Sequence, residues 1–451
     1  MRKVWIVLTL LAAGLLHAQE EPAEIAAETR IPALIAIAQE AYQSNDHERM
    51  AEALARAVAL RPHLADLRFL LAKAYALQDE KESAYNALVI LQSQGLSFNM
   101  TGDPDFENLR GYQLYDYLEE EFAKNAEPYA DPKPRFQIDG EDLLIEALAY
   151  DPKADRFLAG SVTEGTVYAV GEDGSLTEFI TPDPRNGLLG ISAMAVDVDN
   201  NALWVASGAS PHVQHVRPAD RGRTFLHRFE LDSGAYVTRY APAAGPGYFI
   251  DLALSPEGTV YVADSVRPVI WRLDPAADQP SLQAFFGSES LTGIRTLTID
   301  DSGEHLYFAD YELGLFGVKM GESTAFEVHL GRNLNLSGID LMRWFQDSLI
   351  LVQNGVVPKR VLRFQLFDDH RNGRHAQAMT SGQPDFRNPT TGTLVGSNLV
   401  LIANSHRNAY DPATGQLRPE AEVSPHKVVD VALDFGWIPP PDGSLQHLKK
   451  N

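Results

Sequence analysis

The stretch of sequence that decides the fold runs from Phe249 to Phe286 and reads FIDLALSPEGTVYVADSVRPVIWRLDPAADQPSLQAFF. Apolar and polar residues alternate over short runs, which is typical of β-strands with one buried face. A Pro-Glu-Gly turn signal at residues 256–258 separates the first two runs, and Asp264 marks the turn before the third. The stretch therefore predicts four short antiparallel strands joined by turns.

The same plan recurs along the chain, with units that begin near residues 143, 190, 249, 293, 337 and 389. Six units of four strands that repeat radially predict an all-β, six-bladed β-propeller over residues 137–440. The sixth unit shows only three clear strands. The segment PRFQI at residues 134–138 can supply the fourth, which would close the ring and cover an exposed edge.

Residues 19–125 have a different composition, rich in Ala, Leu and Glu with helical periodicity. Equivalent positions recur 34 residues apart, namely Ile37 and Leu71, Ala38 and Ala72, and Leu54 and Leu88. A helix–turn–helix unit of this length resembles the tetratricopeptide repeat and predicts a small all-α domain of two units. A third unit from Asp105 to Lys124 and a plain helical bundle both stay open. Three prolines mark residues 126–136 as a linker.

The two ends of the chain lie outside these domains. Arg2 and Lys3, followed by a short apolar run and a small residue at Ala18, predict a signal peptide over residues 1–18. We expect an exported protein, periplasmic or secreted, with no integral membrane span after cleavage; a retained anchor is the alternative. Residues 441–451 are expected to form a C-terminal tail.

The composition excludes several function classes. The formal net charge is −23, and it becomes −25 once Arg2 and Lys3 are removed, so nucleic acid is not an expected partner. The chain has no cysteine, which rules out disulfide support and a lipid anchor on cysteine. A solvated acidic surface is the simplest interpretation of the charge.

Three segments carry a family resemblance: LLIEALAYDP, IDLALSPEGTVYVADS and GIRTLTIDDSGEHLYFAD. They resemble the senescence marker protein, gluconolactonase and regucalcin family, over about residues 138–440. The resemblance implies a six-bladed propeller whose channel holds a divalent cation. It also implies the ligand types: a Glu on the first blade, an Asn on a middle blade and an Asp on the next. In the family's lactonases this cation polarises the lactone carbonyl.

The innermost strands of the six units can be aligned to show what the channel holds. One level of the channel receives Glu146, Ser192, Ile250, Arg295, Asp340 and Thr391. Asp251 would face the channel only if its strand slipped by one residue. On the family pattern Glu146 matches the Glu ligand, whereas Ile250 replaces the Asn and Arg295 replaces the Asp. Because Arg295 would repel a divalent cation, we expect it to pair with Glu146 or Asp340 instead.

Three functions from different classes stay open. The first is a binding module of the gluconolactonase-like class, with a degenerate metal site and no cofactor. Its partner would be a protein or peptide on the helical domain, or a small polar or anionic ligand in the channel. The channel ligand would meet Glu146, Ser192, Asp251, Arg295, Asp340 and Thr391. The second is a metal-dependent lactonase or esterase that uses calcium or another divalent cation, with Glu146 and Asp340 as candidate catalytic residues. The third is a scaffold within an envelope complex.

Two weaker motifs receive structural interpretations. His212 and His215, in SPHVQH, are expected in a surface loop rather than a metal site, because prolines flank them. A polar residue follows the second strand of every unit and is expected to cap the adjoining turn by hydrogen bonds to backbone. These residues are Ser161, Ser207, Asp264, Asp310, Asn354 and Asn404.

Overall fold

The structure is a computed structural model that describes residues 25–435, apart from residues 141, 215, 244, 323 and 331–333. The expected signal peptide (1–18) and tail (441–451) lie outside the described residues, as does His215. Within the described part of the chain, no helix is both long and apolar enough to span a membrane.

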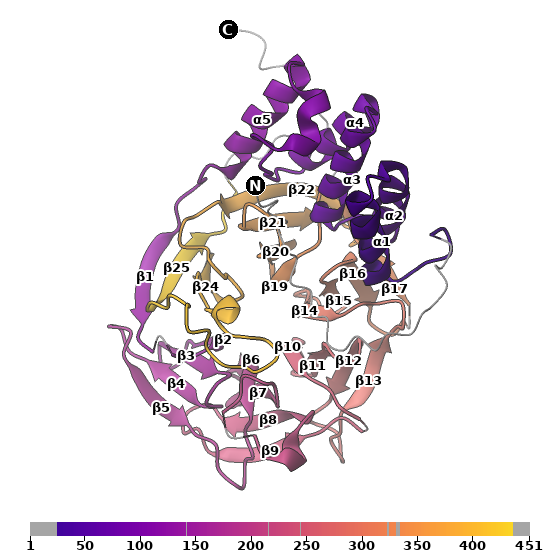
Figure 1. Cartoon of the computed structure of the whole chain (residues 1–451). Coiled ribbons are helices and arrows are strands. Elements are labelled where there is room, and N and C mark those ends of the chain that lie inside the picture. Colours follow the sequence, from indigo (N-terminus) through magenta and orange to yellow (C-terminus); the bar gives the residue numbers. More distant parts are fainter. Residues whose placement is uncertain are drawn as a thin grey trace.

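Six β-sheets are arranged in a ring around a common centre, so the predicted six-bladed propeller is confirmed (Figure 1). The first three blades follow the chain strand by strand, with the innermost strand first. Blade one comprises β2 (Ile145–Asp151), β3 (Arg156–Ser161), β4 (Val167–Val170) and β5 (Leu176–Ile180). Blade two comprises β6 (Gly190–Asp197), β7 (Ala202–Gly208), β8 (Thr224–Glu230) and β9 (Tyr236–Tyr240). Blade three comprises β10 (Phe249–Leu254), β11 (Val260–Asp264), β12 (Val269–Leu273) and β13 (Gln283–Gly287).

The fourth and fifth blades follow the same plan, with one added strand. Blade four comprises β14 (Ile294–Ile299), β15 (His305–Asp310), β16 (Gly314–Lys319) and β17 (Ala325–Glu327). Blade five comprises β19 (Ile339–Phe345), β20 (Ser348–Gln353), β21 (Arg360–Leu366) and β22 (Asn372–Ser381). A short strand, β18 (His329–Leu330), pairs in parallel with the outer edge of β22.

The sixth blade closes the ring with strands from both ends of the domain. Its order is β1-β25-β24-β23, where β23 is Thr391–Val395, β24 is Asn398–Ile402, β25 is His426–Ala432 and β1 is Lys133–Ile138. The outermost strand β1 pairs antiparallel with β25. The expected closure by residues 134–138 is therefore confirmed. Strand β1 begins at Lys133, inside the segment that was expected to be linker.

Among the described residues of the propeller, six large hydrophobic clusters are each shared by two neighbouring blades. The cluster between blades six and one includes Ile138 of β1 and Val428 of β25, both fully buried. The alternation of apolar residues along the strands supplies these faces. Blade-on-blade packing therefore fixes the ring, and closure by β1 buries what would otherwise be an open edge.

The helical region precedes the propeller, and its described part, from residue 25 on, contains five α-helices and one 3₁₀ turn. The helices are α1 (Ile31–Gln43), α2 (His47–Leu60), α3 (Ala65–Leu77), α4 (Lys81–Ser93) and α5 (Gln113–Ala126), and the turn is η1 (Pro104–Leu109). The first four form two pairs, and each helix of the second pair begins 34 residues after its counterpart. Asp46 caps α2 by accepting a 3.1 Å hydrogen bond from the Arg49 amide.

These helices match the expected 34-residue spacing, but a tetratricopeptide identity is not established by it. Ala38 and Ala72 are buried, which allows the close helix approach that the sequence suggested. The third unit considered for residues 105–124 is not a helix pair, because η1 and the single helix α5 occupy that segment.

The helical region contacts blades four and five (Figure 1). The backbone carbonyl of His63 accepts hydrogen bonds from Asn335 Nδ2 at 2.6 Å and from Ser337 Oγ at 2.7 Å. Arg61 forms an ion pair with Glu312 at 2.9 Å. Buried Arg360 donates to the Gln94 carbonyl at 2.9 Å. The helices therefore rest on the same face of the ring that carries the ends of β15 and β20.

Candidate functional site

A β-bulge in each of the first five innermost strands aims one side chain into the channel. The pairing register skips one residue at the start of β2, β6, β10, β14 and β19. The skipped residues are Glu146, Ser192, Ile250, Arg295 and Asp340. A bulged residue does not take part in the ladder, so its side chain can be re-aimed. The sequence alignment therefore placed these residues at the correct level of the channel, but it did not predict the bulges that direct their side chains there.

The predicted channel residues all line one pocket at the centre of the ring. In the sixth blade, where β23 has no bulge, both Thr390 and Thr391 contribute. Two arginines that the alignment did not place, Arg343 and Arg407, also line the pocket. The charged lining therefore consists of three guanidinium groups and three carboxylates, and the six formal charges cancel.

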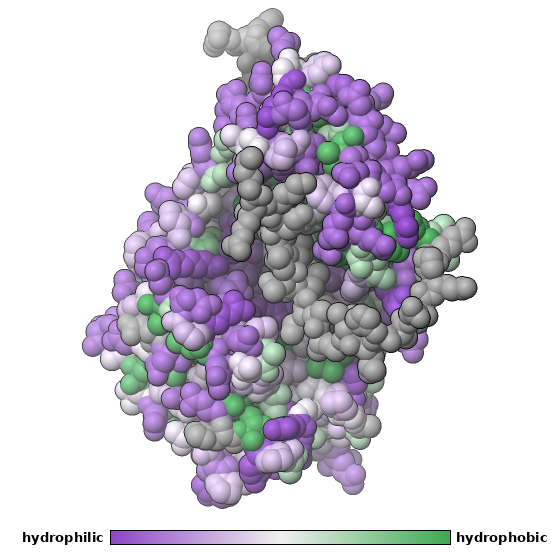
Figure 2. All heavy atoms as spheres, in the orientation of Figure 1, coloured by the Kyte–Doolittle hydropathy of each residue, from purple (hydrophilic) through white to green (hydrophobic). Residues whose placement is uncertain are grey.

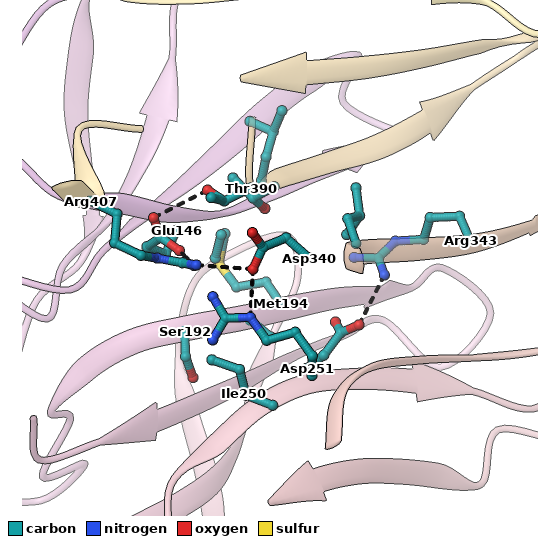
Figure 3. A pocket seen from close by; sticks show the side chains of 15 residues that line it. Glu146, Ser192, Met194, Ile250, Asp251, Asp340, Arg343, Thr390 and Arg407 are labelled. Carbon is teal, nitrogen blue, oxygen red and sulfur yellow. Dashed lines mark hydrogen bonds and ion pairs between the residues drawn. The ribbon is translucent and has the colours of Figure 1, made fainter. Parts of the chain in front are cut away.

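Asp340 is the centre of the ionic network (Figure 3). Its Oδ1 atom lies 2.6 Å from Arg295 Nε and 3.1 Å from Arg407 Nη1. Its Oδ2 atom accepts a hydrogen bond of 2.9 Å from Asn354. Of the two partners considered for Arg295, Asp340 is the one that the structure shows.

Glu146 pairs with Arg407, whereas the sequence had suggested Arg295 as its partner. Its Oε2 atom pairs with Arg407 Nη2, and its Oε1 atom accepts a 3.1 Å hydrogen bond from Thr390. Figure 3 shows the Arg407 guanidinium between Glu146 and Asp340, bridging blades one and five. Arg407 belongs to η3 (Arg407–Ala409), a turn in the long excursion between β24 and β25.

Asp251 and Ser192 line the pocket but are held by the propeller itself. Asp251 Oδ2 accepts hydrogen bonds from Thr296 Oγ1 at 2.5 Å and the Leu297 amide at 3.2 Å, and it pairs with Arg343 at 3.2 Å. The strand slip that seemed necessary for Asp251 is supplied by the bulge at Ile250. Ser192 Oγ lies 2.5 Å from the Phe249 carbonyl oxygen.

Electrostatics keep Arg295 charged in this pocket. Burial alone would lower the pKa of Arg295, but the Asp340 carboxylate beside it raises the pKa above its ordinary value. Burial, together with the charge of Asp340, raises the pKa of the nearby Tyr311 phenol to about 12. Tyr311 is therefore a neutral hydroxyl at physiological pH. The terminal nitrogens of Arg295 have no hydrogen-bond partner within the described chain, and its side chain is 21% exposed.

The donor set does not fit the divalent cation that the family resemblance implies. Ile250 offers no ligand atom, Arg295 carries a positive charge, and the Arg407 guanidinium already bridges Glu146 and Asp340. The free space among the lining side chains is about 20 Å³, which suits a single water molecule. The positive charges beside Glu146 and Asp340 are therefore those of the Arg295 and Arg407 side chains.

Three of the six polar residues after the second strands, Ser161, Asp264 and Asp310, cap the adjoining turn by accepting from backbone amides, as expected. Ser207 and Asn404 instead accept from amides outside that turn, at Leu189 and Lys427. Asp264 Oδ1 accepts from the amides of Tyr248, Val266 and Arg267. Asn354 departs from this role, since its amide group donates to Asp340. Its Oδ1 atom is buried without a hydrogen-bond partner in the described structure.

The loop expected around His212 is confirmed in the part of the chain that the structure describes. His212 lies in a turn, and its ring meets Tyr410 edge-on, with centroids 5.9 Å apart. Figure 2 shows that hydrophilic residues dominate the face turned to the viewer, with apolar residues in small separate groups.

The fold and the pocket together define a six-bladed β-propeller with an ionic channel and an N-terminal helical region. Among solved structures, the PQQ-bound form of aldose sugar dehydrogenase from Streptomyces coelicolor is 15% identical, with a TM-score of 0.45, over 68% of this chain and 98% of that one. A gluconolactonase from Xanthomonas campestris is 13% identical, with a TM-score of 0.42, over 57% and 82%. A catalytically inactive virginiamycin B lyase from Staphylococcus aureus is 11% identical, with a TM-score of 0.43, over 68% and 100%.

No protein-family model and no curated protein sequence matches the chain. At these identities and TM-scores, the three structures say nothing about the activity of this protein. Membership of the gluconolactonase family therefore stays a prediction from the sequence motifs.

Proposed function

We propose that the protein is an exported binding module whose channel mouth takes the anionic group of a small organic ligand. The observation that carries the proposal is Arg295. It is held by Asp340 through Nε, while its terminal nitrogens have no hydrogen-bond partner within the described residues. A guanidinium fixed on one edge presents its other donors in the fork geometry that suits a carboxylate or a phosphate.

The size of the pocket restricts how such a ligand binds. About 20 Å³ of free space admits little more than a water molecule. The anionic group would displace that water at Arg295, and the rest of the ligand would lie over the channel mouth. A ligand that goes deeper needs the segment around Arg407 to move, because its guanidinium spans the pocket.

Titration calorimetry with inorganic phosphate and a panel of small carboxylates tests the proposal. We expect binding by the wild type and at least about a tenfold loss in Arg295→Met, since a charge-assisted bidentate contact contributes about 1.5–3 kcal/mol. Arg272→Met is the matched control, because Arg272 is exposed on β12 away from the channel. Equal affinity in the two variants, or no anion binding by the wild type, would contradict the proposal.

The second candidate is a metal-dependent lactonase or esterase. The observation in its favour is that the carboxylates of Glu146 and Asp340 converge on a single cationic group. This function needs Arg407 to withdraw and a metal to take its place. Calcium titration of the wild type and of Arg295→Asp separates the two candidates. Calcium binding by the wild type that is lost in Glu146→Gln would favour the hydrolase, whereas a gain of binding only in Arg295→Asp would favour the binding module.

A peptide partner for the helical region is a third proposal, with a narrower basis. The first turns of α5 expose Leu114 and Tyr117, and Tyr112 just before them is also half exposed. Aromatic side chains of this kind are frequent anchors in protein interfaces.

A further inference from the structure

One group of three metal-ligating side chains stands out among the described residues, and it lies away from the channel. Asp300, His305 and His370 bring one donor atom each to within 4.8 Å of one another. Asp300 and His305 flank the turn between β14 and β15, and His370 lies in the turn between β21 and β22. The group therefore joins blades four and five.

This group is on the opposite face of the ring from the channel mouth. Strands β14 and β15 are antiparallel, with Ile294 paired to Asp310 at one end and Ile299 paired to Leu306 at the other. Arg295 and the helical contacts lie at the first end, whereas Asp300 and His305 lie at the second. A ligand at this group would be independent of the ligand proposed for the channel.

Hydrogen bonds to one oxygen of the Asp300 carboxylate direct its other oxygen toward the two histidines. Its Oδ1 atom accepts from Ser302 Oγ at 2.9 Å and from the amides of Glu304 at 3.0 Å and His305 at 3.2 Å. Those bonds leave Oδ2 facing the two imidazoles. Outer hydrogen bonds of this kind fix the direction of a first-shell carboxylate in metal sites.

The distances between donor atoms fit a small divalent ion. Asp300 Oδ2 lies 3.8 Å from His370 Nδ1 and 2.9 Å from His305 Nδ1, and the shorter contact is a hydrogen bond that the ion would replace. Donors around a tetrahedral zinc ion with bonds of about 2.0 Å are about 3.3 Å apart, which falls between these two distances. Two imidazoles and one carboxylate are the donors that zinc and other borderline transition metals prefer to calcium or magnesium.

We propose that Asp300, His305 and His370 form a binding site for a divalent transition-metal ion of the zinc type, which cross-links blades four and five. Three protein ligands leave at least one position for water. The Tyr307 hydroxyl lies 3.3 Å from His370 Nδ1, directly beside the site.

Metal binding requires a change in one ring. The imidazoles of His305 and His370 are stacked, with centroids 4.1 Å apart and planes 13° from parallel, so one ion cannot lie in both ring planes. The side chain of His305 is only 10% exposed, whereas that of His370 is 35% exposed and belongs to a surface turn. The His370 ring is therefore the one that turns toward the ion.

The surroundings favour a cation. The turn that carries Asp300 also contains Asp301 and Glu304, and the turn that carries His370 also contains Asp368 and Asp369. The basic group in these two turns, Arg371, stacks on the Phe326 ring at 4.7 Å. A concentration of negative charge raises the local concentration of cations.

Calorimetric titration of the untagged full chain with zinc chloride, in excess calcium and magnesium, tests the site. We expect one zinc ion per chain and a rise in the thermal unfolding midpoint. Cobalt(II) added in place of zinc should give the visible absorption band of a cobalt ion bound by histidine and carboxylate ligands. His370→Ala and Asp300→Asn should each weaken zinc binding by more than about tenfold, since even outer-shell losses cost about 10–100-fold in metal affinity.

His329→Ala is the matched control, because His329 is exposed and its Nδ1 atom lies 3.8 Å from a carboxylate oxygen of Glu327. His370 is in a surface turn, so His370→Ala should keep the circular dichroism of the wild type. Zinc affinity that is equal in His370→Ala and His329→Ala overturns the proposal. Absence of zinc binding by the wild type overturns it as well.

Discussion

Removal of the Arg407 guanidinium is the perturbation that most directly tests the channel network. Arg407→Met keeps most of the apolar stem and deletes the cation that bridges Glu146 and Asp340. Asp340 would retain Arg295 at 2.6 Å and Asn354 at 2.9 Å. Among the groups that the structure describes, Glu146 would retain only the Thr390 hydroxyl. The cost should therefore fall mainly on Glu146.

The magnitude follows from the exposure of the partners. Exposed ion pairs contribute about 0.2–1 kcal/mol, and breaking a buried pair costs about 3–5 kcal/mol. The Arg407 side chain is 27% exposed and that of Glu146 is 8% exposed, which places this pair between the two classes. We expect Arg407→Met to lower the free energy of unfolding by about 1–3 kcal/mol, with a coupling energy to Glu146 of about 1–2 kcal/mol.

A double-mutant cycle in urea gives the coupling energy. The unfolding free energies of the wild type, Arg407→Met, Glu146→Gln and the double variant are compared, with m-values checked for constancy. Arg418→Met is the control, because Arg418 is exposed in the same excursion. A coupling energy below about 0.3 kcal/mol, which is the limit of additivity for independent sites, would refute the inferred bridge.

Three further predictions concern stability. His227 is fully buried, and burial lowers its pKa to about 3, so it stays neutral when the unfolded chain takes up a proton below the ordinary value of 6.5. The neutral His227 ring therefore contributes its full stabilisation above pH 6.5. At pH 5 the free energy of unfolding in urea should be lower by about 2 kcal/mol, and this loss should be absent in His227→Gln. Ile138→Ala should cost about 2–5 kcal/mol in the same assay, because Ile138 is fully buried at the ring closure. Arg360→Met should speed proteolysis between the helices and the propeller, because it removes the 2.9 Å hydrogen bond that the Arg360 guanidinium donates across this contact to the Gln94 carbonyl.

The repeated part of the sequence allowed the ring to be predicted almost completely. Short alternating runs and turn signals recur in every blade, and the same pattern forces every blade to bury its faces against its neighbours. Closure by residues 134–138 followed from counting strands in the sixth unit. The helices were also predictable, because their periodicity is local. The third helical unit that stayed open for residues 105–124 is not a helix pair, since residues 104–109 form a 3₁₀ turn.

The channel was only half predictable, for a physical reason. Glu146, Arg295 and Asp340 come from equivalent positions of repeated strands, so alignment places them together. Arg407 comes from the excursion between β24 and β25, whose path depends on packing against the finished ring. No spacing in the sequence relates Arg407 to Glu146, which lies 261 residues earlier.

This difference in origin bears on how the channel acquires its chemistry. The blades alone would supply Glu146, Asp251 and Asp340 against Arg295 and Arg343, which is an excess of one negative charge. Arg407 cancels that excess, and it does so from a segment that is free of the repeat and so can change without disturbing the blades. The segment between β24 and β25 therefore sets the net charge at the channel mouth, while the repeated strands of the blades position the carboxylates. A substitution at Arg407 should accordingly change what the channel binds far more than it changes the ring.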